Sequence, residues 1–550
     1  MIFILISILL GSLGIFLLVN FRILQNKTIV ILITSVFILI ILLWVIIKYY
    51  PKSRNNLNEQ DKHILTVGLT AQVQEGFGIF GQGANTVVNS RIRDLLHESL
   101  IKAHPFKENN VIKIIYKPCL LTAMPEKITE GEFAGYYQCC LSPGIKFHNG
   151  CILNNQDVID NFLYNKEKGG EHSSFIQDIK PDNNDINRFF ILFTDDQDPL
   201  NYHHLSKIPI IMFEGDKNKI PNRRIGLGAF QLKYFDNNNI QLDRFMDYYR
   251  KDDYGDSNIK QIKFCYIPDA QTINMHLKRG DIDISYLILD KTSSKDLSRS
   301  SDLQIMKPES LTITYLFLNC QKLSIEERKS IVETLTPDKK KQFLEQLGEI
   351  SERYQIVNSM SDPRMIGYLE TPNFDNFCVS RKPDTNKSIS FLSINQTSPI
   401  PYRYASRITD FLQKAKFNVK HEIRELNELA NQGEKGDFDM LMISENFENI
   451  TPYYVLNYFF GPKDKGGSMC WHQLSDNEEI IKGLNNLKLN SDNAPDYDQQ
   501  VRDFHQLLFH KYAIIPLYCQ KYSEIAIRKN IKNFNINILG DQDITKLRKI

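Results

Sequence analysis

The chain has 550 residues, of which 24% are charged and 42% are hydrophobic, and its formal net charge is +1. This length predicts two or three domains, and the balanced charge excludes a bulk electrostatic attraction to nucleic acid. The nine cysteines are scattered and form no Cys-x-x-Cys pair, which argues against a zinc or thioredoxin-like site. Most of them are expected to be small buried apolar residues, and their spacing does not define a disulfide connectivity.

Two uncharged segments open the sequence, Met1–Asn20 and Ile29–Ile47. Each is about long enough to cross a bilayer as a helix, which takes roughly 20 residues. A cleaved signal peptide is the competing interpretation, but the first segment lacks a positive start and no small-residue cleavage site follows the second. The sequence therefore predicts a transmembrane hairpin over residues 1–50 and a polar linker over residues 51–61. Basic residues lie on both sides of the second segment, so the positive-inside rule leaves the orientation open.

The next elements are predicted from hydrophobic spacing. His63–Gly68 reads as the first strand, and Asn89–Ala103 has the spacing of a helix with one apolar face. Phe189–Phe193 and Ile208–Met212 read as short buried strands. Further on, Ala270–Lys278 is predicted to be a helix that ends at a glycine.

The stretch Leu141–Gly150 has the densest turn chemistry in the chain. A strand-like run ends in a Pro-Gly turn, an Asn-Gly turn follows, and Asn155–Val158 then starts a helix. These residues fix backbone geometry, and His148 among them is expected to be structural.

No catalytic, metal-binding or nucleotide-binding pattern stands out. The sequence contains neither Gly-x-Ser-x-Gly nor His-Glu-x-x-His. The adjacent pair His203–His204 lacks the i, i+4 spacing of a helical metal site. No helix start follows the Gly-x-Gly within Ile225–Lys233, which disfavours a phosphate loop. Neither an enzyme, nor a cofactor, nor a metal site is expected.

Six segments, in family order, resemble the family 5 extracellular solute-binding proteins, the receptors for peptides, nickel and sugars of ABC importers. The six segments are Leu141–Val158, Ile225–Lys233, Ile267–Ile284, Tyr315–Leu347, Asp439–Ile443 and Tyr512–Phe534.

The resemblance implies an α/β fold of two lobes, like that of type II periplasmic binding proteins, with an extra subdomain in lobe one and two transmembrane helices before it. Two crossover strands are expected near Pro308–Tyr315 and Ile514–Tyr518. The expected ranges are 62–92, 200–307 and 516–550 for lobe one, 93–199 for the subdomain, and 308–515 for lobe two.

The resemblance also implies a ligand site between the lobes. Glu448 falls where peptide-binding members of the family hold the ligand's α-amine, and Glu445 stands at the position of a pocket tryptophan. Two carboxylates there favour a cationic group on the ligand. Lobe one would contribute the backbone of Gly76 and the apolar ring of Phe77.

Two further side chains are candidates for the same site. Arg403 could bind a ligand carboxylate in a bidentate manner, and Trp471 could form a pocket wall. The alternatives are a solvated acidic loop around residues 445–448, a glycine-rich surface loop around residues 74–78, and a core position for Trp471.

The implied function is that of a membrane-anchored receptor that binds an oligopeptide-like solute by hinge closure and delivers it to ABC permease subunits. The body would lie on the extracytoplasmic side of a bacterial inner membrane. One alternative is a transport-inactive sensor or assembly protein with the same fold. Another is a membrane-anchored hydrolase that uses Glu445 and Glu448.

Overall fold

In the computed structural model, residues 58–550 form one compact unit. The residues whose structure is described are 61–79, 87–168, 172, 174–215, 220–236, 238–348, 352–370, 387–395, 399–447, 449–462, 477–489 and 495–550. The predicted transmembrane hairpin lies outside them. Among the described helices, none has the length and apolar character needed to span a bilayer.

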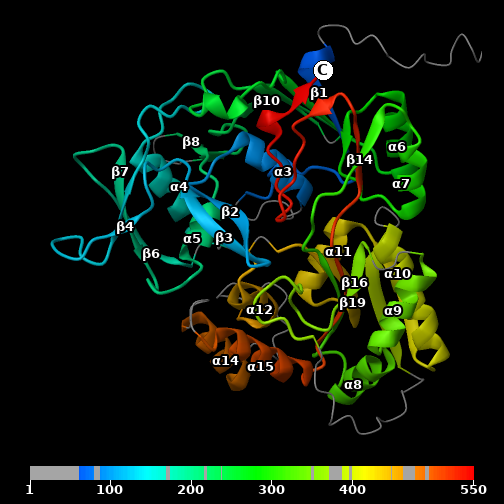
Figure 1. Cartoon of the computed structure of the whole chain (residues 1–550). Coiled ribbons are helices and arrows are strands. Elements are labelled where there is room, and N and C mark those ends of the chain that lie inside the picture. Colours follow the sequence, from blue (N-terminus) through cyan, green and yellow to red (C-terminus); the bar gives the residue numbers. More distant parts are fainter. Residues whose placement is uncertain are drawn as a thin grey trace, which may run out of the picture. The chain divides into compact units, whose positions relative to one another are not determined.

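The first sheet has seven strands in the order β10-β11-β12-β1-β13-β21-β14 (Figure 1). Strand β1 lies at its centre and is parallel to both β12 and β13, whereas the outer pairs are antiparallel. The strands are β10 (Phe230–Phe235), β11 (Asn239–Arg244), β12 (Gln261–Tyr266), β1 (Ile64–Leu69), β13 (Ile284–Ser285), β21 (Ile525–Arg528) and β14 (Leu303–Met306). The helices close to it in sequence are α3 (Val87–Leu96), α6 (Ala270–Arg279) and α7 (Lys291–Ser298).

The second sheet has six strands in the order β16-β20-β15-β19-β17-β18. Every residue of β15 and β20 is buried, because helices cover both faces of this sheet. The strands are β16 (Tyr354–Ile356), β20 (Ile514–Gln520), β15 (Ile313–Leu318), β19 (Met440–Glu445), β17 (Ser388–Ile394) and β18 (Asn418–Arg424). The helices are α8 (Ile325–Thr334), α9 (Pro337–Gln346), α10 (Pro399–Lys414), α11 (Leu426–Lys435), α12 (Pro452–Phe460), α14 (Glu478–Leu489) and α15 (Tyr497–Phe509).

Two crossovers connect the sheets. Residues 307–312 lead from β14 to β15, and residues 521–524 lead from β20 back to β21. The two segments run antiparallel, because Ser310 N donates to Lys521 O at 3.0 Å and Ser523 N donates to Pro308 O at 2.9 Å. The return crossover follows Ile514–Tyr518, which belongs to strand β20 of the second sheet.

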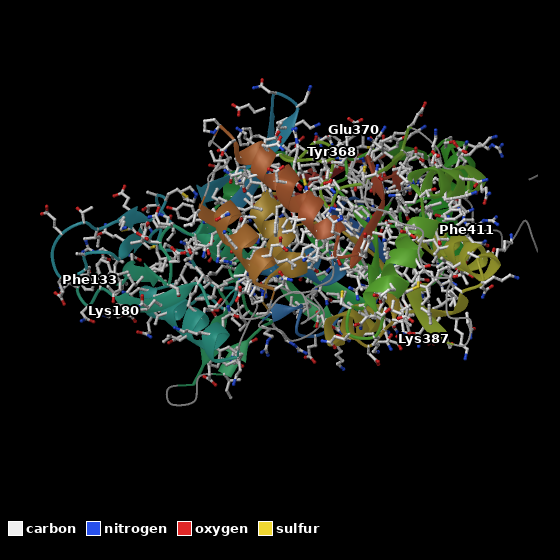
Figure 2. All side chains as sticks on the ribbon, turned by 90° about the horizontal axis from the view of Figure 1, so that it is seen from below. Phe133, Lys180, Tyr368, Glu370, Lys387 and Phe411 are labelled. Carbon is white, nitrogen blue, oxygen red and sulfur yellow. The ribbon has the colours of Figure 1, made fainter. Side chains whose placement is uncertain are left out.

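A smaller four-stranded sheet lies within residues 126–193, inside the range 93–199 for which the sequence predicts a subdomain, and the subdomain itself stays a prediction. Its order is β4-β5-β7-β6, formed by β4 (Glu126–Lys127), β5 (Tyr137–Cys140), β7 (Arg188–Phe193) and β6 (Ile176–Pro181). The helices α4 (Asn155–Glu167) and α5 (Asn201–Lys207) belong to the same region. Phe133 and Lys180, labelled in Figure 2, both contact the ring of Tyr136 at one end of this sheet. Two short hairpins, β2 (Ile101–Glu108) with β3 (Val111–Pro118) and β8 (Met212–Glu214) with β9 (Ile220–Asn222), complete this part.

The helix predicted over 89–103 is shorter than expected, because α3 ends at Leu96 and residues 101–108 form strand β2. The backbone at Gly228 lies close to the C-terminal end of α3. Gly228 N donates to the carbonyl oxygen of Leu96 at 2.9 Å, so a segment far away in the sequence covers the last turn of the helix.

The stretch Leu141–Gly150 holds that segment in place. His148 Nδ1 accepts from the backbone N–H of Gly226 at 3.2 Å, which makes Nε2 the protonated nitrogen that donates to Gly228 O at 3.1 Å. Gly144 and Gly150 adopt φ of +76° and +90° in the two predicted turns. Asn154 and Asp157 then form a capping box at the start of α4. His148 is therefore structural, as the turn chemistry predicts.

The tautomer of His148 predicts an acid-sensitive contact. Burial lowers the pKa of His148 to about 4, below its ordinary value near 6.5. The folded state thus binds fewer protons than the unfolded state between these values, and stability falls as the pH drops from about 6.5 toward 4. We expect this residue to account for about 3 kcal/mol of that loss.

Urea denaturation at several pH values tests this expectation with His148→Gln, which keeps a donor and an acceptor but does not titrate. The variant should show a flatter dependence of unfolding free energy on pH below 6.5 than the parent chain. An identical dependence in both proteins would contradict the assignment.

Candidate functional site

The carboxyl ends of the parallel strands in the first sheet form one side of the candidate site. Since β12 and β13 flank β1 and run parallel to it, the loops after β1 and β13 leave the sheet at the same edge. In α/β sheets, ligands bind outside the carboxyl ends of strands where the connections diverge to opposite sides. The loop after β1 contains Gln74–Gly78, one of the two regions singled out in the sequence.

This loop has a tightly wound backbone. Phe77 and Gly78 adopt φ of +51° and +74°, and Gln74 N donates to the side-chain oxygen of Asn89 on α3 at 3.1 Å. The ring of Phe77 is fully buried and packs edge-on against Phe235 with centroids 5.7 Å apart. Gly76 keeps some exposed surface. The role of Phe77 as a wall of the ligand site stays a prediction.

The second sheet contributes the end of β19. Glu445 is its last residue, is partly exposed, and lies at the carboxyl end of a strand that is parallel to β17. Burial, and then the charge of Glu445, raises the pKa of Tyr315 on the neighbouring strand β15. Glu448 and Trp471 lie outside the described residues, so their predicted roles are not addressed by this geometry.

A C-terminal loop, Ile536–Gln542, brings the two edges together. On one side, Asn446 Nδ2 donates to Leu539 O at 2.9 Å. On the other side, the hydroxyl of Tyr286, the residue after β13, donates to the side-chain oxygen of Gln542. Figure 1 shows this part of the chain, in red, running beside α3. The contacts link the segment after β19 to the region of α3 and the Gln74–Gly78 loop.

Sequence reasoning missed Arg91 and Tyr286, and it did not place the C-terminal loop beside them. The guanidinium of Arg91 on α3 lies over the ring of Tyr286, with its central carbon 3.6 Å from the ring centroid. Burial lowers the pKa of Arg91, while Tyr286 and Asp541 oppose the shift. Turn residues such as Gly540 indicate a loop after Phe534, but nothing local places that loop at the sheet edges.

Arg403 on α10 forms an ion pair with a residue that follows strand β13 of the first sheet. Its guanidinium lies 3.6 Å from the carboxylate of Asp290, which also caps α7 by accepting from Ser293 N at 2.7 Å. The pair connects α10 with the loop after β13. Its predicted role in binding a ligand carboxylate stays a prediction.

A hollow of about 370 Å³ lies at the two crossovers. Its lining is mostly charged and includes a carboxylate–guanidinium pair, Asp362 and Arg364, at 2.7 Å. The lining residues are Lys307, Glu309, Glu352, Gln355, Asp362, Pro363, Arg364, Cys519, Lys521 and Tyr522.

Neither metal nor disulfide chemistry is indicated in the part of the chain that the structure describes. Within these ranges, no group of three His, Cys, Asp or Glu side chains is arranged to hold a metal ion. His204 Nδ1 lies 3.0 Å from His172 Nδ1, a hydrogen-bond distance. The seven described cysteines are free thiols, and four of them are buried, as expected.

Two sheets joined by paired crossovers, with their carboxyl edges meeting at one loop, define a two-lobed α/β fold of the periplasmic-binding-protein type. A solved structure of oligopeptide-binding AppA from Bacillus subtilis in complex with a nonapeptide has this fold, with a TM-score of 0.70 at 17% identity, over 88% of this chain and 99% of that one. The dipeptide-binding protein from Pseudoalteromonas sp. SM9913 in complex with Met-Leu gives 0.72 at 12% identity, over 88% and 100%.

Sequence comparison narrows the class. Residues 132–340 match the model described as bacterial extracellular solute-binding proteins, family 5 Middle. The chain is 24% identical over 417 residues to AppA of Bacillus subtilis (strain 168), covering 68% of this chain and 75% of AppA. It is 26% identical over 300 residues to the probable D,D-dipeptide-binding periplasmic protein DdpA of Escherichia coli (strain K12), covering 52% and 55%. The chain is thus similar in sequence and in fold to solute-binding proteins of family 5, and residues 132–340 carry the family match.

Proposed function

We propose that the chain is the receptor of an ABC importer and that it binds a peptide between two lobes built on the two sheets. The observation that carries the proposal is the meeting of both carboxyl edges at the Ile536–Gln542 loop, next to a pair of antiparallel crossovers. A two-strand connection of this kind allows hinge closure around a ligand. The peptide complexes of AppA and of the dipeptide-binding protein support the choice of ligand class.

The proposal is tested with the full-length chain purified in detergent. Native mass spectrometry should detect a co-purified peptide, and a tripeptide mixture should raise the melting temperature, since a ligand that binds only the folded state stabilises it. A chain that neither carries a peptide nor responds to the mixture would contradict peptide binding.

A second contact between the sheets' regions is expected to stabilise the closed form. Lys488 on α14 lies 2.9 Å from Asp195 and 2.8 Å from Asp198, which follow β7 of the smaller sheet. Lys488→Ala removes both ion pairs, worth about 1 kcal/mol in a partly exposed setting, so peptide affinity should fall by about 5-fold through a shift toward the open form.

Fluorescence titration with peptide measures this loss, and small-angle scattering measures the opening. Lys482→Ala on the same helix is the matched control, since Lys482 is exposed and forms no ion pair with the described residues. Equal peptide affinities for Lys488→Ala, Lys482→Ala and the parent chain would contradict the proposal that the Lys488 ion pairs stabilise the closed form.

The acidic side chains Glu445 and Glu448 are proposed to bind the ligand's ammonium group. A charge-assisted hydrogen bond in a closed cleft is stronger than a neutral one. Glu445→Gln and Glu448→Gln should therefore both weaken peptide binding. The loss should be about 10-fold for the variant whose carboxylate contacts the ligand's amine. The variant that loses about 10-fold in affinity should also lose any preference for peptides with a free N-terminus over peptides with an acetylated one. A preference that survives in both variants would place the amine elsewhere. Gly76, Phe77, Arg403 and Trp471 complete the proposed ligand site.

The uncharged segments of residues 1–50 support a further proposal, that a transmembrane hairpin holds the receptor at the outer side of the bacterial inner membrane, near its permease. The hairpin predicts that the protein stays in the membrane fraction after carbonate extraction, and that externally added protease reaches the body in spheroplasts. Release by carbonate would contradict the anchor. Unchanged peptide uptake after deletion of the gene would instead favour the transport-inactive alternative.

A further inference from the structure

Arg91 stands at the edge where the ligand is proposed to bind, and its position is fixed from three directions. The helix α3 carries it, the ring of Tyr286 supports its flat face at 3.6 Å, and Gln542 of the C-terminal loop holds the hydroxyl of Tyr286. When a guanidinium stacks on an aromatic ring, its N–H donors point outward in the plane of the guanidinium, parallel to the ring. There they can approach a carboxylate.

Within the described residues, nothing accepts a hydrogen bond from Arg91. Its Nε is buried and has no hydrogen-bond partner. The carboxylate of Asp541, whose charge acts on Arg91, accepts a hydrogen bond from the Asn537 amide at 3.0 Å. A charged group that is removed from water without a partner costs free energy, so an anion arriving at this place would be bound favourably.

We propose that Arg91 binds the C-terminal carboxylate of the peptide ligand. This inference rests on the proposed function. With the ammonium group at Glu445 or Glu448, both ends of the ligand are held inside the site. The ligand class is therefore short peptides with free termini, as opposed to long peptides whose ends extend out of the cleft.

The test compares peptides that differ only at their carboxyl end. The probes are an equimolar tripeptide mixture with free termini and the same mixture as C-terminal amides, titrated against the full-length chain in detergent and followed by thermal shift. The parent chain should need about 10- to 100-fold more of the amides for the same shift, the effect of losing a charge-assisted bidentate contact.

Arg91→Gln should respond to acids and amides alike, at the level that the parent chain shows for amides. Arg91→Lys should recover part of the preference, because it restores the charge without the planar fork. Arg93→Gln is the matched control on the same helix and should keep the full preference. The melting temperatures without ligand show whether each variant is folded.

The outcomes separate this inference from the proposed function. A parent chain that binds acids and amides equally, or an Arg91→Gln variant that still prefers acids, overturns the role of Arg91 while peptide binding stands. A preference that is lost in Arg403→Gln and kept in Arg91→Gln overturns it in favour of the arginine on α10. A parent chain that responds to neither mixture overturns the proposed function itself.

Discussion

Replacing Lys549 with methionine is expected to lower the free energy of unfolding by about 3–5 kcal/mol, the cost of leaving a buried charge without its partner. Lys549 Nζ lies 2.8 Å from the carboxylate of Asp283, and the two side chains are only 6% and 4% exposed. The same ammonium group donates to the carbonyl of Ile64 on the central strand β1. Burial raises the pKa of Asp283 even beside Lys549, so this carboxylate depends strongly on the cation.

The double variant Asp283→Asn with Lys549→Met distinguishes a lost charge from lost packing. The asparagine oxygen can still accept from Thr66 N, which donates to Asp283 at 2.8 Å in the parent chain. Because no buried charge remains, the double variant should be more stable than Lys549→Met alone. Urea denaturation of Asp283→Asn, Lys549→Met and the double variant gives the three values that the comparison needs. A double variant that loses the sum of the two single effects would show that the charges are not coupled.

Replacing Gly228 with alanine should destabilise the fold by about 3 kcal/mol, at the upper end of the usual cost of overpacking. The added Cβ would lie 2.3 Å from the carbonyl oxygen of Leu95 and 2.6 Å from the carbonyl carbon of Leu96. Both are backbone atoms at the end of α3, so no side-chain rotation can relieve the overlap.

Gly144→Ala is the matched control for this substitution. Gly144 belongs to the stretch that holds Gly228 in place, and a Cβ there would meet nothing within 4 Å. Its φ of +76° still makes alanine unfavourable, by about 1–2 kcal/mol. Thermal or urea denaturation should therefore show that Gly228→Ala is less stable than Gly144→Ala. The reverse order of stabilities would contradict the packing argument.

The parts of the fold that follow from local chemistry could be predicted. The turns at Gly144 and Gly150, the capped start of α4, and the end of α6 at Gly280 depend on residues that are neighbours in the sequence. The end of α3 could not be predicted in this way. It coincides with the approach of Gly228, which is 132 positions after Leu96 in the chain numbering.

Gly76, Phe77 and Glu445 were named from the sequence, and their contact with a ligand stays a prediction, whereas Arg91 and Tyr286 were not named. The loop after β1, which contains Gly76, and the end of β19 at Glu445 follow from the order of elements. The stack of Arg91 on Tyr286 joins residues on α3 and after β13, and the loop at Gln542 completes it from the far end of the chain. Contacts between such distant positions depend on packing, and no local pattern of polar or apolar residues encodes them.

The order of strands has a consequence for how the protein is made. The second sheet is built from residues 354–356, 514–520, 313–318, 440–445, 388–394 and 418–424, one continuous stretch that leaves the ribosome as a block. The first sheet begins near residue 64 but lacks β21 until residue 528 has been synthesised, and Lys549 reaches Asp283 later still. The lobe that starts first is thus finished last. Until β21 is synthesised, β13 and β14 both lack the strand that lies between them, and these open edges need protection from aggregation during synthesis.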